Sequence, residues 1–199
     1  ANYTFGFQGK GDSAFLQQRG EEYGFVSRIG ESVLCNGKMV SSTLIRSLIA
    51  EGDLARVNEY LKWPLDYTGV VAYGEQRGRK LGFPTANIAL DNAYALLPNG
   101  VYAVRVRFEN MLYQGVANIG SNPTFEEVER RLEVHLMQFS GNLYGKKIRV
   151  DFLGKLRDET KFSSVEALVE QIQRDIEQAR HFWDQPMQVG RLHDVEKQS

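Results

Sequence analysis

Residues 102–108 read Tyr-Ala-Val-Arg-Val-Arg-Phe, and this stretch decides the fold class. Large apolar and aromatic residues recur at every second position, which is the pattern of a β-strand that buries one face. Four other stretches have a similar β-branched and aromatic character: 67–73, 112–119, 132–139 and 148–153. Turn-forming pairs separate the stretches, and their spacing shows no βαβ alternation. We therefore expect five or six strands that form an antiparallel sheet closed into a small barrel.

Helical patterns flank this strand-rich region. Before it, we expect short helices over residues 12–18, from the Ser41-Ser42-Thr43 cap to Gly52, and from Asp53 to Leu61. After it, Ser163 and Glu166 form a capping box. The apolar residues that follow share one helical face: Val165, Leu168, Ile172, Ile176 and Ala179. We expect this long helix to pack against the outside of the barrel or to close one of its ends.

Composition excludes several classes of protein. The chain has 199 residues, 42% hydrophobic and 25% charged, which is close to the average of globular proteins. A formal net charge of -1 argues against a polybasic nucleic-acid binder, and no apolar run is long enough to span a membrane. Cys35 is the single cysteine, so we expect a reducing, cytoplasmic setting. We expect neither nucleic acid nor membrane as a partner, and the sequence does not define an oligomeric state.

The segment 74–87 carries the strongest chemical signal: Gly-Glu-Gln-Arg-Gly-Arg-Lys-Leu-Gly-Phe-Pro-Thr-Ala-Asn. Bare backbone at glycines lets N–H groups approach an anion, and the neighbouring cations neutralise it. The spacing differs from that of the GxxxxGK[ST] loop. A solvated loop between strands explains the composition about equally well. If the segment binds ATP or phosphate, the candidate residues are Gly74, Arg77, Gly78, Lys80, Gly82, Pro84, Thr85 and Asn87.

Pro84 stiffens the backbone just before two short oxygen-bearing side chains, Thr85 and Asn87. Because they are two residues apart, they point to the same side of an extended chain. A hydroxyl and an amide oxygen are hard, neutral ligands, which suit a Mg²⁺ ion that also binds nucleotide phosphates. Taken alone, a turn in which Thr85 and Asn87 bond their own backbone is the favoured alternative.

The expected strand over 132–139 has a mixed face. Glu133 shares that face with His135, Met137 and Phe139. Partial burial disfavours the ionised form of a carboxylate and prepares it to act as a base. The alternative is a rim residue that pairs with Arg130 or Arg131 in a weak surface ion pair. We expect His135 to pack or hydrogen-bond, because no second His or Cys lies at metal-ligand spacing.

Three further segments carry weaker signals. Ser42, Thr43 and Arg46 place hydroxyl groups, N–H groups and a cation at a helix start, which can hold a phosphate, although ordinary N-capping is favoured by the spacing alone. The segments 115–125 and 156–162 are rich in turn formers and charges, and either can supply a ligand-facing loop.

Taken in order, six motifs resemble the kinase domain of the prokaryotic bifunctional riboflavin kinase/FMN adenylyltransferase family, also called FAD synthetases: RGRKLGFPTAN, LPNGVYAV, GVANIGSNPTF, EVHLMQF, LYGKKIRVDF and LRDETKF. FGFQGKGD and SSTLIR resemble the end of that family's adenylyltransferase domain. The resemblance implies a mainly β protein: a six-stranded antiparallel Greek-key barrel with a long C-terminal helix, preceded by a small α-rich remnant of an α/β nucleotidyltransferase domain. The implied boundaries are 1–64 for the remnant, 65–185 for the kinase domain and 186–199 for a polar tail.

The resemblance also implies an activity, the transfer of the γ-phosphoryl group of MgATP to the 5′-hydroxyl of riboflavin, which gives FMN and ADP. Thr85 and Asn87 match the pair that contacts metal and nucleotide, and Glu133 matches the catalytic base. The Gly74–Gly82 loop matches the flap over the ATP phosphates. Three residues fall in loops that match the nucleotide and flavin sides of the family's site: Asn118, Arg157 and Phe162.

The chain lacks the His-x-Gly-His phosphate motif with which the adenylyltransferase half of the family begins. It also has Asn2-Tyr3 where the family tends to have Asp-Phe. We therefore expect this chain to make FMN and not FAD, while a longer parent protein would also adenylate FMN. The alternative is a non-catalytic regulatory module that binds a flavin or a nucleotide.

Overall fold

The computed structural model describes residues 4–28, 30, 33–74, 77–90, 94–123 and 128–185. The chain divides into two compact units, Ala1–Ser42 and Thr43–Ser199. The predicted polar tail 186–199 lies outside the described residues. Among the described helices, none is long and apolar enough to cross a membrane.

The first unit contains a short 3-10 turn η1 (Phe7–Gly9), the helix α1 (Ser13–Tyr23) and a small hairpin of β1 (Leu34–Cys35) and β2 (Lys38–Met39). Asp12 begins α1 by accepting a hydrogen bond from the Phe15 N–H at 2.8 Å, so this helix starts where the sequence predicts and runs further. Asn36 and Gly37 form the hairpin turn with positive φ angles of 50° and 73°, which is the usual reason for an Asn-Gly pair at such a turn.

The second unit begins with α2 (Ser42–Glu51) and α3 (Leu54–Leu61), both as predicted. Gly52 separates them with a φ of 77°, and Asp53 caps α3 through the Arg56 N–H. Asn58 of α3 donates to the Phe152 carbonyl at 2.9 Å and accepts from the Leu65 N–H at 2.8 Å. These bonds tie α3 to the barrel, so the compact unit begins before the predicted boundary at residue 65. The assignment of residues 1–64 to an adenylyltransferase domain and of residues 65–185 to a kinase domain stays a prediction.

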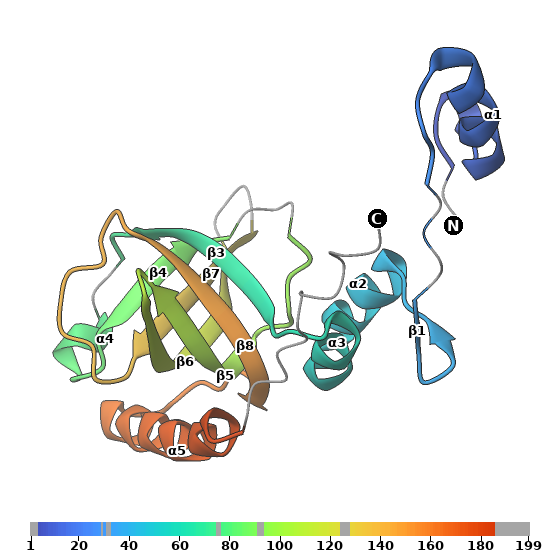
Figure 1. The fold of residues 1–199 in the computed structure, drawn as a ribbon. Helices are drawn as coiled ribbons and strands as arrows, with labels where there is room; N and C mark the ends of the chain where they lie inside the picture. The colour runs from blue at the N-terminus through green and yellow to red at the C-terminus, as the bar shows by residue number, and fades with distance from the viewer. Residues whose placement is uncertain are drawn as a thin grey trace. The chain divides into compact units, whose positions relative to one another are not determined.

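The six remaining strands close into an antiparallel barrel with the order β3-β4-β7-β6-β5-β8 (Figure 1). Strands β5, β6 and β7 follow one another as hairpins, and β4 returns to pair with β7, which is a Greek-key arrangement. The predicted barrel is therefore confirmed. The strands are β3 (Leu65–Ala72), β4 (Thr85–Ala89), β5 (Gly100–Phe108), β6 (Met111–Pro123), β7 (Val128–Leu136) and β8 (Lys147–Arg157).

The interior of the barrel is filled by the alternating apolar side chains of its strands. Tyr102, Val104 and Val106 of β5 are completely buried, as the sequence predicts. Arg105, on the outer face of the same strand, is also buried, because the C-terminal helix covers this part of the barrel. Its guanidinium donates to the carbonyls of Trp183 and Gln185 at 2.6 and 3.0 Å, so the charge is used to hold the end of that helix.

The long helix α5 (Val165–Trp183) packs on the outside of the barrel, against β5, β6 and β8 (Figure 1). Its cap is Ser164, which accepts from the Ala167 N–H at 3.2 Å, so the predicted capping box at Ser163 is wrong by one residue. Ala179 and Trp183 form a buried cluster with Ala103, as the predicted apolar face requires.

Tyr67 links the core to the loop that precedes β5. Its ring contacts that of Phe152, with centroids 5.1 Å apart. Its hydroxyl donates to the Ala95 carbonyl at 3.0 Å and accepts from the Leu97 N–H at 2.9 Å. Because burial penalises the phenolate, it raises the pKa of Tyr67 from 10.0 to about 12.

This shift predicts a loss of stability in alkali. Below pH 10 the phenol is neutral in both the folded and the unfolded chain, whereas between pH 10 and about 12 only the unfolded chain ionises. We expect the free energy of unfolding to fall by roughly 3 kcal/mol over that interval through this group. Urea titrations of the chain and of Tyr67→Phe at several pH values across this interval measure the free energy of unfolding. An identical pH dependence in both proteins would contradict the assignment.

Candidate functional site

The outer face of the barrel brings the predicted site residues into one row. Asn87 of β4 lies opposite Glu133 of β7, and Glu133 lies opposite Asn118 of β6. Side chains in such cross-strand pairs have Cβ atoms about 5 Å apart. The next row places Thr85 opposite His135. Five side chains from three strands are thereby neighbours on one surface.

The alternation of the strands fixes this placement. Leu132, Val134 and Leu136 are buried inside the barrel, so Glu133 must point outward. Ala86 and Ile88 are buried in the same way, which turns Thr85 and Asn87 to the outer face. The prediction that Thr85 and Asn87 share one side of an extended strand is confirmed.

A cavity of about 320 Å³ lies between this outer face and α5, and we call it the central cavity. Leu168 and Ile172 of α5 form an apolar wall, so this part of the helix face lines a cavity. Six residues that the sequence singled out line it: Gly78, Thr85, Asn118, Glu133, Arg157 and Phe162. Glu133 is half-buried here.

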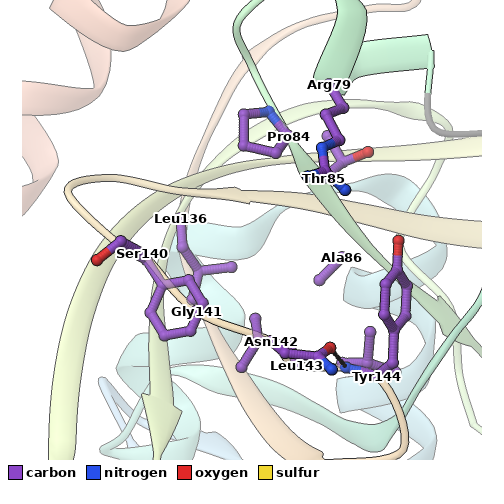
Figure 2. Close-up of a pocket in the computed structure, with 12 residues that line it drawn as sticks. Arg79, Pro84, Thr85, Ala86, Leu136, Ser140, Gly141, Asn142, Leu143 and Tyr144 are labelled. Carbon is purple, nitrogen blue, oxygen red and sulfur yellow. Dashed lines mark hydrogen bonds between the residues drawn. The ribbon is translucent and has the colours of Figure 1, made fainter.

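A second cavity of about 350 Å³, the loop cavity, lies between the segment that carries Arg79, Pro84 and Thr85 and the loop from Ser140 to Tyr144. Figure 2 shows these two segments facing each other, with Arg79 and Thr85 on one side and Tyr144 on the other. The ring of Tyr144 stacks on that of Tyr73, with centroids 4.1 Å apart. Thr85 lines both cavities and is therefore their common wall.

The glycine-rich segment is more ordered than a simple loop. Residues Arg77–Lys80 form one helical turn, α4, which the sequence did not predict. The Gly78 carbonyl accepts from the N–H groups of Leu81 and Phe83 at 3.1 and 2.9 Å, and Gly82 follows with a φ of 85°. The side chains of Arg77 and Lys80 lie outside the described part of the structure, so their role at a phosphate stays a prediction.

Gly74 lies directly against the metal-ligand candidate Asn87. A Cβ atom at Gly74 would collide with the carboxamide group of Asn87. This close approach explains why a glycine occurs two residues after the end of β3, independently of any contact between its backbone and a phosphate.

His135 fixes the backbone beside Thr85. Its Nδ1 atom lies 2.9 Å from the Pro84 carbonyl oxygen. Its ring packs edge-to-face with the Phe83 ring, with the ring centroids 5.6 Å apart. The prediction that His135 hydrogen-bonds is confirmed. In the described residues no group of three or more His, Cys, Asp or Glu side chains is placed to hold a metal ion.

Residues 61–183 match the family model of riboflavin kinase, or flavokinase. This chain belongs to the riboflavin kinase family. It is 39% identical over 184 residues to a bifunctional riboflavin kinase/FMN adenylyltransferase of Haemophilus influenzae, which covers 92% of this chain and 59% of the relative. The same comparison with the Bacillus subtilis protein of that name gives 35% identity over 185 residues, 92% of this chain and 58% of the relative.

A crystal structure described as a macrolide-efflux protein from Streptococcus pneumoniae superimposes with a TM-score of 0.76 at 36% identity. The match covers 89% of this chain and 57% of that protein. The chain thus spans somewhat less than three fifths of the length of these relatives. The predicted family is confirmed by the match of its kinase domain.

Two acidic residues of the kinase domain's cavity were missed by the sequence reasoning, Glu159 and Asp175. Asn99 holds Glu159 by donating to its Oε2 atom at 3.0 Å. Arg130 donates to the Asn99 side chain at 3.1 Å and also to the Leu97 carbonyl, so it supports this loop. Asp175 follows Leu168 by seven residues and therefore lies on the same apolar face of the helix. A carboxylate on such a face could have been identified from the sequence as a candidate buried residue.

The predicted phosphate motif near the N-terminus contributes no residue to the lining of either cavity. Ser42, Thr43 and Arg46 occupy the first turns of α2, all three are exposed, and none lines the central or the loop cavity. Their role therefore stays a prediction.

Proposed function

We propose that the kinase domain of this chain transfers the γ-phosphoryl group of MgATP to the 5′-hydroxyl of riboflavin. One observation carries the proposal: the carboxylate of Glu133 stands between Asn87 and Asn118, in a cavity whose wall at Thr85 is shared with a second cavity. A phosphoryl transfer needs two substrates that meet end to end beside a base.

Riboflavin fits the central cavity by its chemistry. Leu168, Ile172 and Phe162 offer apolar and aromatic surface to a flat ring system. Glu133 and Asn118 offer hydrogen-bond acceptors and donors to the hydroxyl groups of the ribityl chain. The ring is therefore proposed to lie toward α5, with the ribityl chain toward the barrel.

ATP fits the loop cavity. Arg79 borders it on the side where phosphates would lie, and Tyr144 offers an aromatic surface on the other side. In this arrangement the terminal phosphate reaches the wall at Thr85, beyond which the central cavity begins.

The donor set beside that wall suits Mg²⁺. The Thr85 hydroxyl and the Asn87 amide oxygen lie on one face of β4, and both are hard, neutral ligands. Held by these two residues, a Mg²⁺ ion would neutralise negative charge on the phosphoryl group. We propose Thr85 and Asn87 as its protein ligands.

Glu133 is proposed to act as the general base. Its carboxylate takes the proton of the 5′-hydroxyl as the oxygen forms a bond to the γ-phosphorus, and the bond from that phosphorus to the β-bridging oxygen breaks to release ADP. The Arg79 guanidinium stabilises the phosphate oxygens, together with those N–H groups of the glycine-rich turn that are not bonded within the turn. The chain itself supplies mainly orientation and charge.

We also propose that residues 1–64 derive from the adenylyltransferase domain of a longer bifunctional protein. The relatives carry both activities in their names, and this chain spans about 58% of their length. In that longer protein Ser42, Thr43 and Arg46 would contact a nucleotide phosphate. We also propose that the protein is cytoplasmic.

The chain is expected to convert riboflavin and MgATP to FMN, and Glu133→Gln is expected to lower kcat by about 10²–10⁴ because the general base is lost. Flavins separated by chromatography measure the product, and calorimetry with MgADP checks that nucleotide binding survives. Glu109→Gln is the matched control, because Glu109 is exposed in the turn between β5 and β6.

Tight riboflavin binding without any FMN would contradict the proposed activity and support the regulatory module instead. Wild-type turnover by Glu133→Gln at neutral pH would leave the activity in place and remove Glu133 as the base.

Gly74→Ala is expected to weaken Mg²⁺-dependent nucleotide binding, because the added methyl group displaces the Asn87 carboxamide. The Kd for MgADP should rise roughly tenfold, whereas the Kd for ADP measured with excess chelator should change little. Gly30→Ala is the control, because a Cβ atom there meets nothing within 4 Å. Equal weakening with and without the metal would show that Asn87 is not a ligand.

A further inference from the structure

A carboxylate of α5 that the proposed reaction does not use is buried beside the central cavity. Asp175 has only 1% of its surface exposed, yet it lies on a helix whose other acidic residues face solvent. Burial of an ionised carboxylate is costly unless the charge is paired and hydrogen-bonded. A side chain kept at such a position has a specific partner.

That partner is Arg157, the last residue of β8. Its Nε atom lies 2.9 and 3.1 Å from the two carboxylate oxygens of Asp175, and its Nη2 atom lies 2.9 Å from Oδ2. Gln171 also donates to Asp175 Oδ1 at 2.8 Å. Bidentate contact of this kind fixes the plane of a guanidinium group as well as its position.

The guanidinium forms part of the cavity wall. Its central carbon lies 5.5 Å from the centre of the Phe162 ring, and Nη1 donates to the Asp158 carbonyl at 3.0 Å. Arg157, Phe162 and Asp175 all line the central cavity. The pair thus holds both the side chain of Arg157 and the loop that leads from β8 to α5.

The strand itself is irregular where Arg157 leaves it. Tyr102 pairs with Lys155, but Val101 pairs with Arg157, so one extra residue of β8 is accommodated at Leu156. A bulge of this kind moves the following residue to the other face of the sheet. Without it, Leu156 would lie opposite Val101, and the arginine would point away from the cavity.

We propose that Asp175 is a positioning residue for the flavin: it holds Arg157 in the wall of the central cavity, where the guanidinium receives the ring system. The inference rests on the proposed function, since it assumes that riboflavin occupies this cavity. Asp175 acts through Arg157 and does not itself take part in phosphoryl transfer.

The chemistry of the fixed guanidinium specifies what it recognises. Bonds to Asp175 and Asp158 use three of its five N–H donors, so two remain for a ligand. The pyrimidine side of a flavin carries carbonyl oxygens that accept such bonds. Because Asp175 neutralises the charge of Arg157, this wall suits an uncharged ring better than an anion.

The test compares Asp175→Asn with Glu177→Gln, which makes the same chemical change at an exposed position of the same helix. Asp175→Asn should raise both the Kd and the KM for riboflavin roughly tenfold, since a charge-assisted bidentate contact is lost. The KM for ATP and the kcat at saturating riboflavin should change less than about threefold. Calorimetry, with and without MgADP, gives the Kd.

A purely structural role would lower the melting temperature and the active fraction, and it would leave the KM for riboflavin unchanged. A folded Asp175→Asn protein that binds riboflavin like the wild type therefore overturns the inference. Glu177→Gln should behave as the wild type in every measurement.

If Asp175→Asn does not fold, Arg157→Lys provides the test, because it keeps the positive charge and removes the paired N–H donors of the guanidinium group. It should weaken riboflavin binding by a similar factor, and unchanged binding would again overturn the inference. If both proteins fold, the variant that carries Asp175→Asn and Arg157→Lys together should bind riboflavin no more weakly than the single variant with the lower affinity. Weakened riboflavin binding in a chain that makes no FMN would refute the proposed kinase activity alone.

Discussion

The site depends on the register between β4, β7 and β6. Asn87, Glu133 and Asn118 are neighbours only because these strands pair as they do. A slip of one residue in β7 would carry Glu133 into the barrel and turn Val134 outward. The buried side chains on either side of Glu133 oppose that slip, since each would lose its place in the core. The apolar interior therefore positions the polar row on the outer face.

The helix α5 has two roles on that outer face. Toward its C-terminal end, Ala179 and Trp183 pack against β5, and Arg105 holds the last carbonyls of the helix. Toward its N-terminal end, Leu168 and Ile172 line the central cavity. One apolar stripe thus anchors the helix and also supplies the surface for a ring system.

Much of the fold follows from short-range patterns in the sequence. The alternation in residues 102–108 identified β5, and the two-residue spacing of Thr85 and Asn87 placed them on one side of β4. Glu133 was found because it shares a face with apolar residues. Each of these inferences needs only the geometry of one strand, and the family resemblance extended them to the order of the strands.

Other features needed contacts that no local pattern contains. The pairing of Asn87 with Glu133 joins strands that are separated by β5 and β6 in the chain. Arg105 alternates with the core residues of β5 and is nevertheless buried, because a helix far along the chain covers it. The bulge before Arg157 and its bond to Asp175 likewise depend on how β8 meets β5 and α5.

A crystal structure of the chain with riboflavin and MgADP tests the central claim most directly. The account predicts that the flavin lies in the central cavity, with its 5′-hydroxyl oxygen about 2.6–3.2 Å from a carboxylate oxygen of Glu133. It also predicts that Thr85 and Asn87 are protein ligands of the metal. A flavin bound elsewhere, or a Glu133 side chain turned away from the 5′ oxygen, would contradict the account.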